Sequence, residues 1–126
     1  MRILIAEDDR IARFLLKKVA LPYGDVVTAS DGGIALEILE TSAEVNEVFE
    51  MVILDVMMPD VDGFSLLRHI RSEDALRGHH TVVILTTAFA DLDNDETGSA
   101  RRADFVMHKP FRMQTLVNIF EKSCHL

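Results

Sequence analysis

The sequence has almost no cysteine, no long hydrophobic run and no excess of positive charge, and each absence excludes a class of protein. Cys124 is the only cysteine among the 126 residues, so an internal disulfide is excluded and a reducing cytoplasm is the expected location. The longest strictly apolar runs are four residues, far below the roughly 18 of a membrane span, so we expect no membrane partner. Residues 3–6 are also too short for the core of a signal peptide.

The charge balance is acidic. The chain has 21 Asp and Glu against 13 Lys and Arg, which gives a net charge of −8. Neutralising phosphates requires clustered Lys and Arg, so we expect no direct nucleic-acid partner. Hydrophobic residues make up 48% of the chain, which excludes a disordered protein. At about 100–200 residues per domain, residues 1–126 are expected to form one domain.

Short apolar runs alternate with helical patterns along the whole chain. Predicted strands lie at residues 3–6, 26–29, 51–54, 81–86 and 105–107. Between them, apolar residues recur at three- and four-residue spacing, as at Ile11, Phe14, Leu15 and Val19, which is typical of amphipathic helices. Strands that are apolar throughout and separated by helices indicate a parallel sheet covered on both faces. The pattern therefore predicts a doubly wound α/β fold with a five-stranded parallel sheet.

Reactive polar residues stand where four of these strands end. Glu7 and Asp8 follow the first strand and Asp55 follows the third. Thr86 and Thr87 end the fourth, and Lys109 follows the fifth. Ligands of open parallel sheets bind beyond the carboxyl ends of the strands. We therefore expect three carboxylates, a hydroxyl and an ammonium to gather at one edge.

Three neighbouring carboxylates repel one another unless a cation lies among them. Oxygen ligands without cysteine or clustered histidine favour Mg²⁺ over zinc. Mg²⁺ commonly shares its coordination with phosphate oxygens, so a phosphoryl group is the natural ligand. Lys109 and a threonine hydroxyl add a positive charge and a hydrogen bond for it.

The chain resembles the response-regulator receiver domain of two-component signalling over essentially its whole length. Four pieces carry the resemblance in order and at the family's spacing: residues 3–9 (ILIAEDD), residues 55–63 (DVMMPDVDG), Thr87-Ala88, and residues 109–111 (KPF). The resemblance implies a flavodoxin-like sheet with strand order 2-1-3-4-5. It also implies a single receiver domain spanning residues 1–126.

The resemblance assigns the acceptor and the metal ligands. Asp55 is implied to be the nucleophile that takes a phosphoryl group from a histidine kinase or a histidine phosphotransfer protein. Asp8, Asp55 and the backbone carbonyl of Met57 are implied to bind Mg²⁺, with Glu7 acting through water. The protein is then a switch rather than an enzyme, and catalyses only its own phosphorylation and slow autodephosphorylation.

The resemblance also assigns the phosphoryl contacts and the output surface. Thr87 and the Ala88 N–H are implied to hold the phosphoryl oxygens, Lys109 to pair with them, and the Lys109–Pro110 bond to be cis. Residues 91–124 are implied to bind a downstream protein or to form a homodimer. Residues 93–102 have almost no apolar stripe, so we expect a helix of low stability there, and we expect residues 91–104 to become ordered or to repack in the signalling state.

Two alternatives come from other functional classes. An aspartyl-phosphate phosphatase of similar architecture has a second aspartate two residues after its nucleophile, where this chain has Met57. A constitutive, unphosphorylated interaction module tends to lose one of the key residues, and none is lost here. The resemblance implies that Met57 and Phe89, two residues after Asp55 and Thr87, flank the path of water to the phosphorylated Asp55. Both are bulky and apolar, so we expect a long-lived phosphoryl group.

Overall fold

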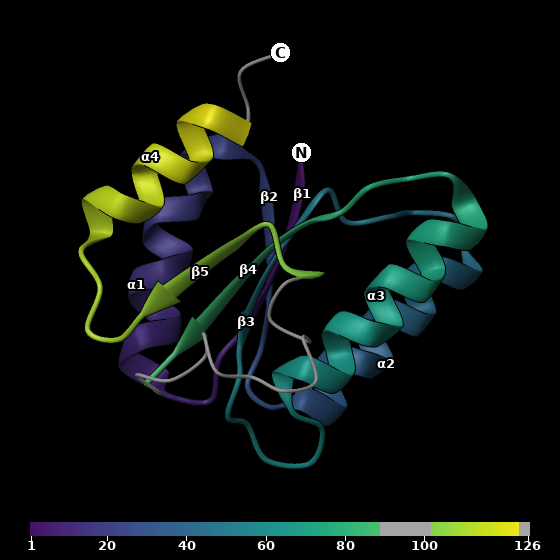
Figure 1. The fold of residues 1–126 in the computed structure, drawn as a ribbon, viewed down its shortest axis with the longest axis horizontal. Helices are drawn as coiled ribbons and strands as arrows, with labels where there is room; N and C mark the ends of the chain where they lie inside the picture. Colours follow the sequence, from purple (N-terminus) through teal and green to yellow (C-terminus); the bar gives the residue numbers. More distant parts are fainter. Residues whose placement is uncertain (89–101, 124–126) are drawn as a thin grey trace.

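The computed structural model describes residues 1–88 and 102–123 (Figure 1). Phe89, Cys124 and residues 91–101 of the expected output segment 91–124 lie outside the described residues, and so does all but the last residue of the helix expected at residues 93–102. The described elements are β1 (Arg2–Ala6), α1 (Arg10–Ala20), η1 (Leu21–Tyr23), β2 (Asp25–Ala29), α2 (Gly32–Glu44), β3 (Met51–Asp55), α3 (Gly63–Arg77), β4 (Val82–Thr87), β5 (Phe105–His108) and α4 (Met113–Ser123).

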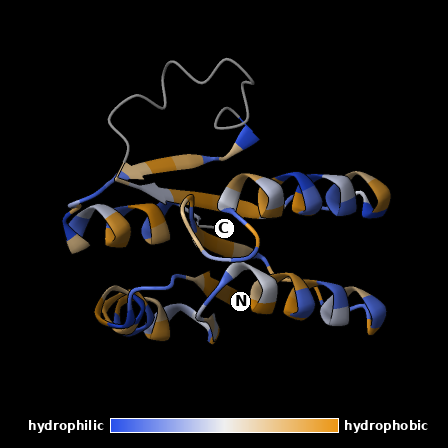
Figure 2. Cartoon of the chain, turned by 90° about the horizontal axis from the view of Figure 1, so that it is seen from below, coloured by the Kyte–Doolittle hydropathy of each residue, from blue (hydrophilic) through white to orange (hydrophobic). Residues whose placement is uncertain are grey.

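The five strands form one parallel sheet in the order β2-β1-β3-β4-β5, which confirms the predicted fold class and strand order. Helices α1 and α4 cover one face, and α2 and α3 cover the other (Figure 1). Figure 2 shows the strands mostly in the hydrophobic colour, between helices that carry both colours. None of the described helices is long and apolar enough to cross a membrane.

Alternation along the strands divides the core into two layers. Leu4, Val52 and Leu85 pack toward α2 and α3, whereas Ile5, Ile53 and Ile84 pack toward α1 and α4. Successive side chains of a strand point to opposite faces, so each strand contributes to both layers. Strands that are buried on both faces in this way explain the unbroken apolar runs of the sequence.

Side chains of Asp cap three helices where the sequence enters them. Asp9, Asp31 and Asp62 each accept a hydrogen bond from a backbone N–H in the first turn of α1, α2 and α3. Such a cap satisfies a donor that the helix itself leaves unpaired. Asp9, the third acid after β1, is therefore a helix cap.

The apolar face predicted for α1 is wrong, although the helix itself is confirmed. Ile11 and Phe14 are 70% and 64% exposed, and the residues that α1 buries are Leu16 and Ala20. The spacing of apolar residues identifies a helix. It does not tell which side of that helix packs against the sheet and α4. The observed packing places Leu16 and Ala20 in the core, with the partly buried Val19 against it.

Arg71 organises a polar cluster at the amino ends of β4 and β5. Its guanidinium lies 2.9 Å from the carboxylate of Asp74 and 2.8 Å from that of Asp104, and also donates to the carbonyl oxygens of Thr81 and Arg102. Thr81 in turn donates to Asp74 through its hydroxyl and its N–H. The sequence predicts a fourth strand from residue 81, but β4 begins one residue later, at Val82. Thr81 hydrogen-bonds to Asp74 on α3 instead.

The carboxylate of Asp104 is held in its ionised form by this cluster. Burial works against its ionisation, but hydrogen bonds from the Val83 N–H, His80 and Arg71 outweigh burial and lower the pKa of Asp104. A carboxylate with a lowered pKa stabilises the folded state above its ordinary pKa of about 3.9. That contribution is lost as the pH falls through the lowered pKa.

We expect Asp104→Asn to reduce the free energy of unfolding at pH 7 by on the order of 2 kcal/mol, because an amide cannot replace charge-assisted hydrogen bonds to Arg71 and Val83. The difference from the parent protein shrinks as the pH falls through the lowered pKa of Asp104, because the parent's own carboxylate then takes up a proton. Urea titrations followed by circular dichroism at several pH values measure this, with the exposed Glu40→Gln as the control. A difference that is independent of pH contradicts the role of the ionised carboxylate.

Candidate functional site

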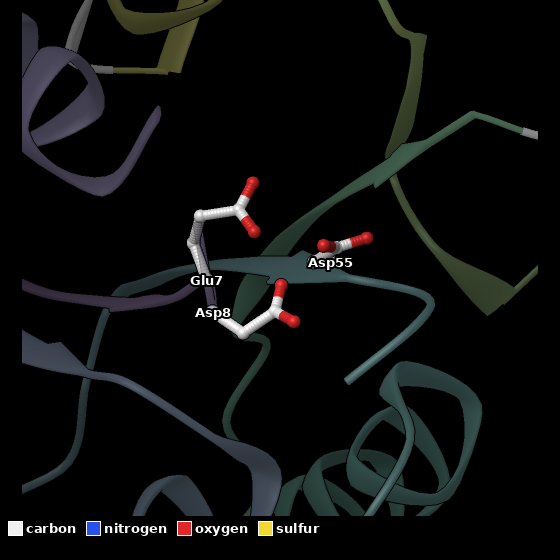
Figure 3. Close-up of side chains that lie close together, drawn as sticks. All are labelled: Glu7, Asp8 and Asp55. Atoms are coloured by element: carbon white, nitrogen blue, oxygen red, sulfur yellow. The ribbon is translucent and has the colours of Figure 1, made fainter. Parts of the chain in front are cut away.

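Three carboxylates gather at the carboxyl edge of the sheet, as the sequence predicts. Glu7 directly follows β1, and Asp55 is the last residue of the adjacent strand β3. Carboxylate oxygens of Glu7, Asp8 and Asp55 all lie within 4.8 Å of one another. Figure 3 shows the three side chains directed toward a common space. Glu7 and Asp55 are buried, whereas Asp8 is exposed at the mouth of the site.

Lys109 bridges the two buried carboxylates. Its Nζ lies 2.7 Å from Oε1 of Glu7 and 3.1 Å from Oδ2 of Asp55. Lys109 follows β5, so its side chain reaches past β4 to arrive at β3 and β1. One ammonium therefore offsets part of the repulsion between two carboxylates in a partly buried setting.

The site shifts the pKa of two of its own groups. Burial raises the pKa of the Glu7 carboxyl, the neighbouring Asp55 raises it further, and the hydrogen bond from Lys109 offsets part of the increase. For Lys109, burial favours the neutral amine, but the hydrogen bonds to Glu7 and Asp55 outweigh it and raise the pKa. The site therefore keeps a charged ammonium beside a carboxyl that resists ionisation.

The loop after β3 turns sharply over the Asp55 backbone. The Gly63 N–H donates to the carbonyl oxygen of Val56, and a Cβ on Gly63 would lie 2.5 Å from the carbonyl oxygen of Asp55. Only glycine permits this approach, so α3 begins directly behind Asp55. Within the loop, the Met57 N–H donates to Oδ1 of Asp55.

The remaining predicted site residues lie at the same edge. Thr87 is the last residue of β4 and is 1% exposed, and Ala88 follows it at the surface. The Lys109 N–H donates to the carbonyl oxygen of Thr87, and the Lys109–Pro110 bond is cis, as predicted. The Met57 side chain is 61% exposed beside this edge.

Arg13 is a residue of the site that sequence reasoning missed. Its guanidinium, on α1, donates to the carbonyl oxygens of Glu7 and Asp8 and so holds the acidic turn in place. No pattern in the sequence indicates this contact, because a basic residue in the first turns of a helix is ordinarily solvated. The geometry that connects α1 to the turn is a product of tertiary packing.

The acidic cluster has the ligand chemistry of a magnesium site. It offers only oxygen donors, and Asp8 is exposed and so accessible to a hydrated ion. The residues present therefore fit Mg²⁺, and they do not fit a zinc site built on cysteine or histidine.

The family model for the response regulator receiver domain matches residues 3–121. The chain is 33% identical over 122 residues to the response regulator receiver protein CpdR of Brucella abortus, which covers 96% of this chain and 94% of that protein. It is 35% identical to the probable transcriptional regulatory protein SilR of Salmonella typhimurium, over 93% of this chain and 48% of that protein. The chain thus spans about half the length of the first curated relatives that it matches. Because several relatives are transcriptional regulators by name, the absence of a direct nucleic-acid partner stays a prediction.

Solved structures agree with these relatives. The receiver domain of a Francisella response regulator superposes with a TM-score of 0.78 at 27% identity, over 98% of this chain and 96% of that chain. The response regulator TrrA of Thermotoga maritima, in complex with Mg²⁺ and beryllofluoride, superposes with a TM-score of 0.76 at 28% identity, over 97% of each chain. The fold, the acidic edge and the family match lead to one conclusion: the chain belongs to the response regulator receiver domain family of two-component signalling.

Proposed function

We propose that this chain is a phosphorylation-activated switch that accepts a phosphoryl group on Asp55. The observation that carries the proposal is the contact of Lys109 with both Glu7 and Asp55, at an edge where Asp8 adds a third carboxylate. A carboxylate attacks a phosphoanion only when positive charge offsets their repulsion. Lys109 supplies one such charge, and the acidic cluster has the ligands to hold another.

The donor is a histidine kinase or a histidine phosphotransfer protein, the partners with which receiver domains interact. A bond forms between an oxygen of the Asp55 carboxylate and phosphorus as the bond from phosphorus to the donor imidazole nitrogen breaks. The imidazole leaves with that electron pair. Asp55 is only 5% exposed, so the donor has to approach along the open side of the site, past Asp8.

Asp8, Asp55 and the backbone carbonyl of Met57 would hold Mg²⁺, with Glu7 contributing through water. When bound, Mg²⁺ supplies positive charge to the phosphoryl oxygens and to the acceptor carboxylate. Asp8 is the ligand that the unphosphorylated protein leaves most accessible. Before Glu7 can hold a water ligand of Mg²⁺, its carboxylate has to give up part of its hydrogen bonding to Lys109.

The phosphoryl oxygens would be held by residues that follow β4 and β5. Lys109 turns from the carboxylates toward a phosphoryl oxygen, while the Thr87 hydroxyl and the Ala88 N–H donate to others. Thr87 and Lys109 are joined by a backbone hydrogen bond, so a movement of either one is transmitted to the other. We propose that residues 91–124 form the output surface for a downstream protein or a second copy; of that segment the structure describes residues 102–123.

Asp55→Asn should abolish phosphorylation, because an amide is not a nucleophile toward phosphorus. The parent protein, incubated with Mg²⁺ and acetyl phosphate, should gain one phosphoryl mass, and omitting Mg²⁺ should prevent it. Intact-mass spectrometry measures both results. The matched control is Asp60→Asn, an exposed acid in the same loop at φ +76°, a conformation that asparagine tolerates. Labelling of Asp55→Asn equal to that of the parent would falsify the assignment.

Asp8→Ala should abolish Mg²⁺ binding while leaving the fold intact, since Asp8 is exposed and the other two carboxylates are already paired with Lys109. Isothermal titration of the variant with Mg²⁺ should show no saturable heat. Asp9→Ala is the control, because it removes a neighbouring carboxylate that caps α1 and should lower stability by roughly 1 kcal/mol without loss of Mg²⁺ binding. If both variants bind Mg²⁺ as the parent does, the proposed ligand set is wrong.

Met57→Asn should accelerate loss of the phosphoryl group severalfold, because Met57 is 61% exposed beside Asp55 and an amide in its place orients water. Release of phosphate from the isolated phosphoprotein over time measures this. Leu76→Asn, which changes a residue that is 82% exposed on α3, should leave the rate unchanged. An unchanged rate in Met57→Asn contradicts shielding by Met57.

A further inference from the structure

Thr86 carries a buried hydroxyl that the site described above does not use. It is the residue before Thr87 in β4 and is 1% exposed. Its Oγ1 has no hydrogen-bond partner among residues 1–88 and 102–123. Burying a hydroxyl without a partner costs stability, and valine has the same shape without that cost. An unsatisfied buried group of this kind calls for an explanation.

The sheet register places Thr86 beside the phosphoryl acceptor. Thr86 is paired with Asp55 on β3 and with Met107 on β5. Ile84, two residues earlier, packs with Ile53 in the layer toward α1 and α4. Because side chains alternate along a strand and paired residues share a face, Thr86 lies on the same face as Asp55.

Lys109 reaches past β4 with its side chain to Asp55 on β3. Its backbone N–H bonds to Thr87, so the residue begins beside the end of β4. Its Nζ ends at Asp55 and Glu7, which belong to the strands beyond β4. Thr86 therefore lies between the origin of the lysine side chain and the carboxylate that this side chain contacts.

Both oxygens of Asp55 already have donors in this structure. Oδ1 accepts from the Met57 N–H and Oδ2 accepts from Lys109. When Lys109 turns toward a phosphoryl group, the buried side of Asp55 loses its donor. Among the described residues, Thr86 is the one paired with Asp55 that carries an unused hydroxyl.

We propose that Thr86 is a positioning residue whose hydroxyl donates a hydrogen bond to Asp55 in place of Lys109 once Asp55 carries a phosphoryl group. This inference rests on the proposed phosphorylation of Asp55. A contact that is made only in the phosphorylated state stabilises that state relative to the resting one. The Thr86 hydroxyl then lowers the stability of the resting protein and raises the stability of the phosphorylated protein.

Thr86→Val tests both halves of the inference. The resting variant should melt a few degrees above the parent, because a methyl group replaces an unsatisfied hydroxyl. With Mg²⁺ present, the beryllofluoride concentration that half-saturates the thermal shift should rise roughly three- to tenfold, which is the range for one lost hydrogen bond. Thr86→Ser, which restores the hydroxyl, should recover the parental concentration.

Thr81→Val is the matched control. Thr81 is also a buried threonine, 5% exposed, but its hydroxyl donates to Asp74 at 2.7 Å. This variant should melt below the parent and keep the parental response to beryllofluoride.

Three results would overturn the inference or its basis, and they differ from one another. A parental half-saturating concentration in Thr86→Val means that the hydroxyl is not used in the activated state. A lower melting temperature in Thr86→Val means that the hydroxyl is already bonded in the resting state. If the parent itself shows no saturable response to beryllofluoride, the proposed function fails, and the inference fails with it.

Discussion

The ammonium of Lys109 is the positive charge on which the buried part of the site depends. Glu7 and Asp55 end adjacent parallel strands, so the sheet brings their carboxylates together whether or not their charges are balanced. Lys109 reaches both of them from β5, and the same contacts raise its own pKa. Attraction between charges is stronger in a partly buried setting than in water, and so is the penalty for leaving one of them unpaired.

In the resting site, the negative charge of the carboxylates is only partly compensated. Burial raises the pKa of Glu7 despite the ammonium beside it, so the pair of carboxylates is only partly compensated. Asp8, exposed at the edge of the same cluster, adds negative charge that Lys109 does not contact in the described structure. A site with this excess of negative charge favours a further cation, which is the physical reason for expecting a metal ion at the acidic edge.

The two ends of the sheet are held in different ways. At the amino ends of β4 and β5, the planar guanidinium of Arg71 bonds to two carboxylates and two carbonyl oxygens, and so fixes α3 to both strands. At the carboxyl ends, a flexible lysine side chain bridges β1 and β3. An arginine fork loses its geometry when one partner moves, whereas a lysine can exchange partners. Rearrangement is therefore easier at the end that carries Asp55.

The sequence by itself determined the parallel sheet, its order by resemblance, and the residues at its carboxyl edge, because unbroken apolar strands and the polar residues that end them are local patterns. It did not determine which stripe of α1 is buried, since Ile11 and Phe14 satisfy the helical period equally well and are nevertheless exposed. It also did not reveal the contact of Arg13 with the acidic turn. Two successive threonines end β4, and composition cannot tell them apart. Only the tertiary structure decided that Thr86 is the one paired with Asp55, because the register of strand pairing sets which residues lie beside each other on one face of the sheet.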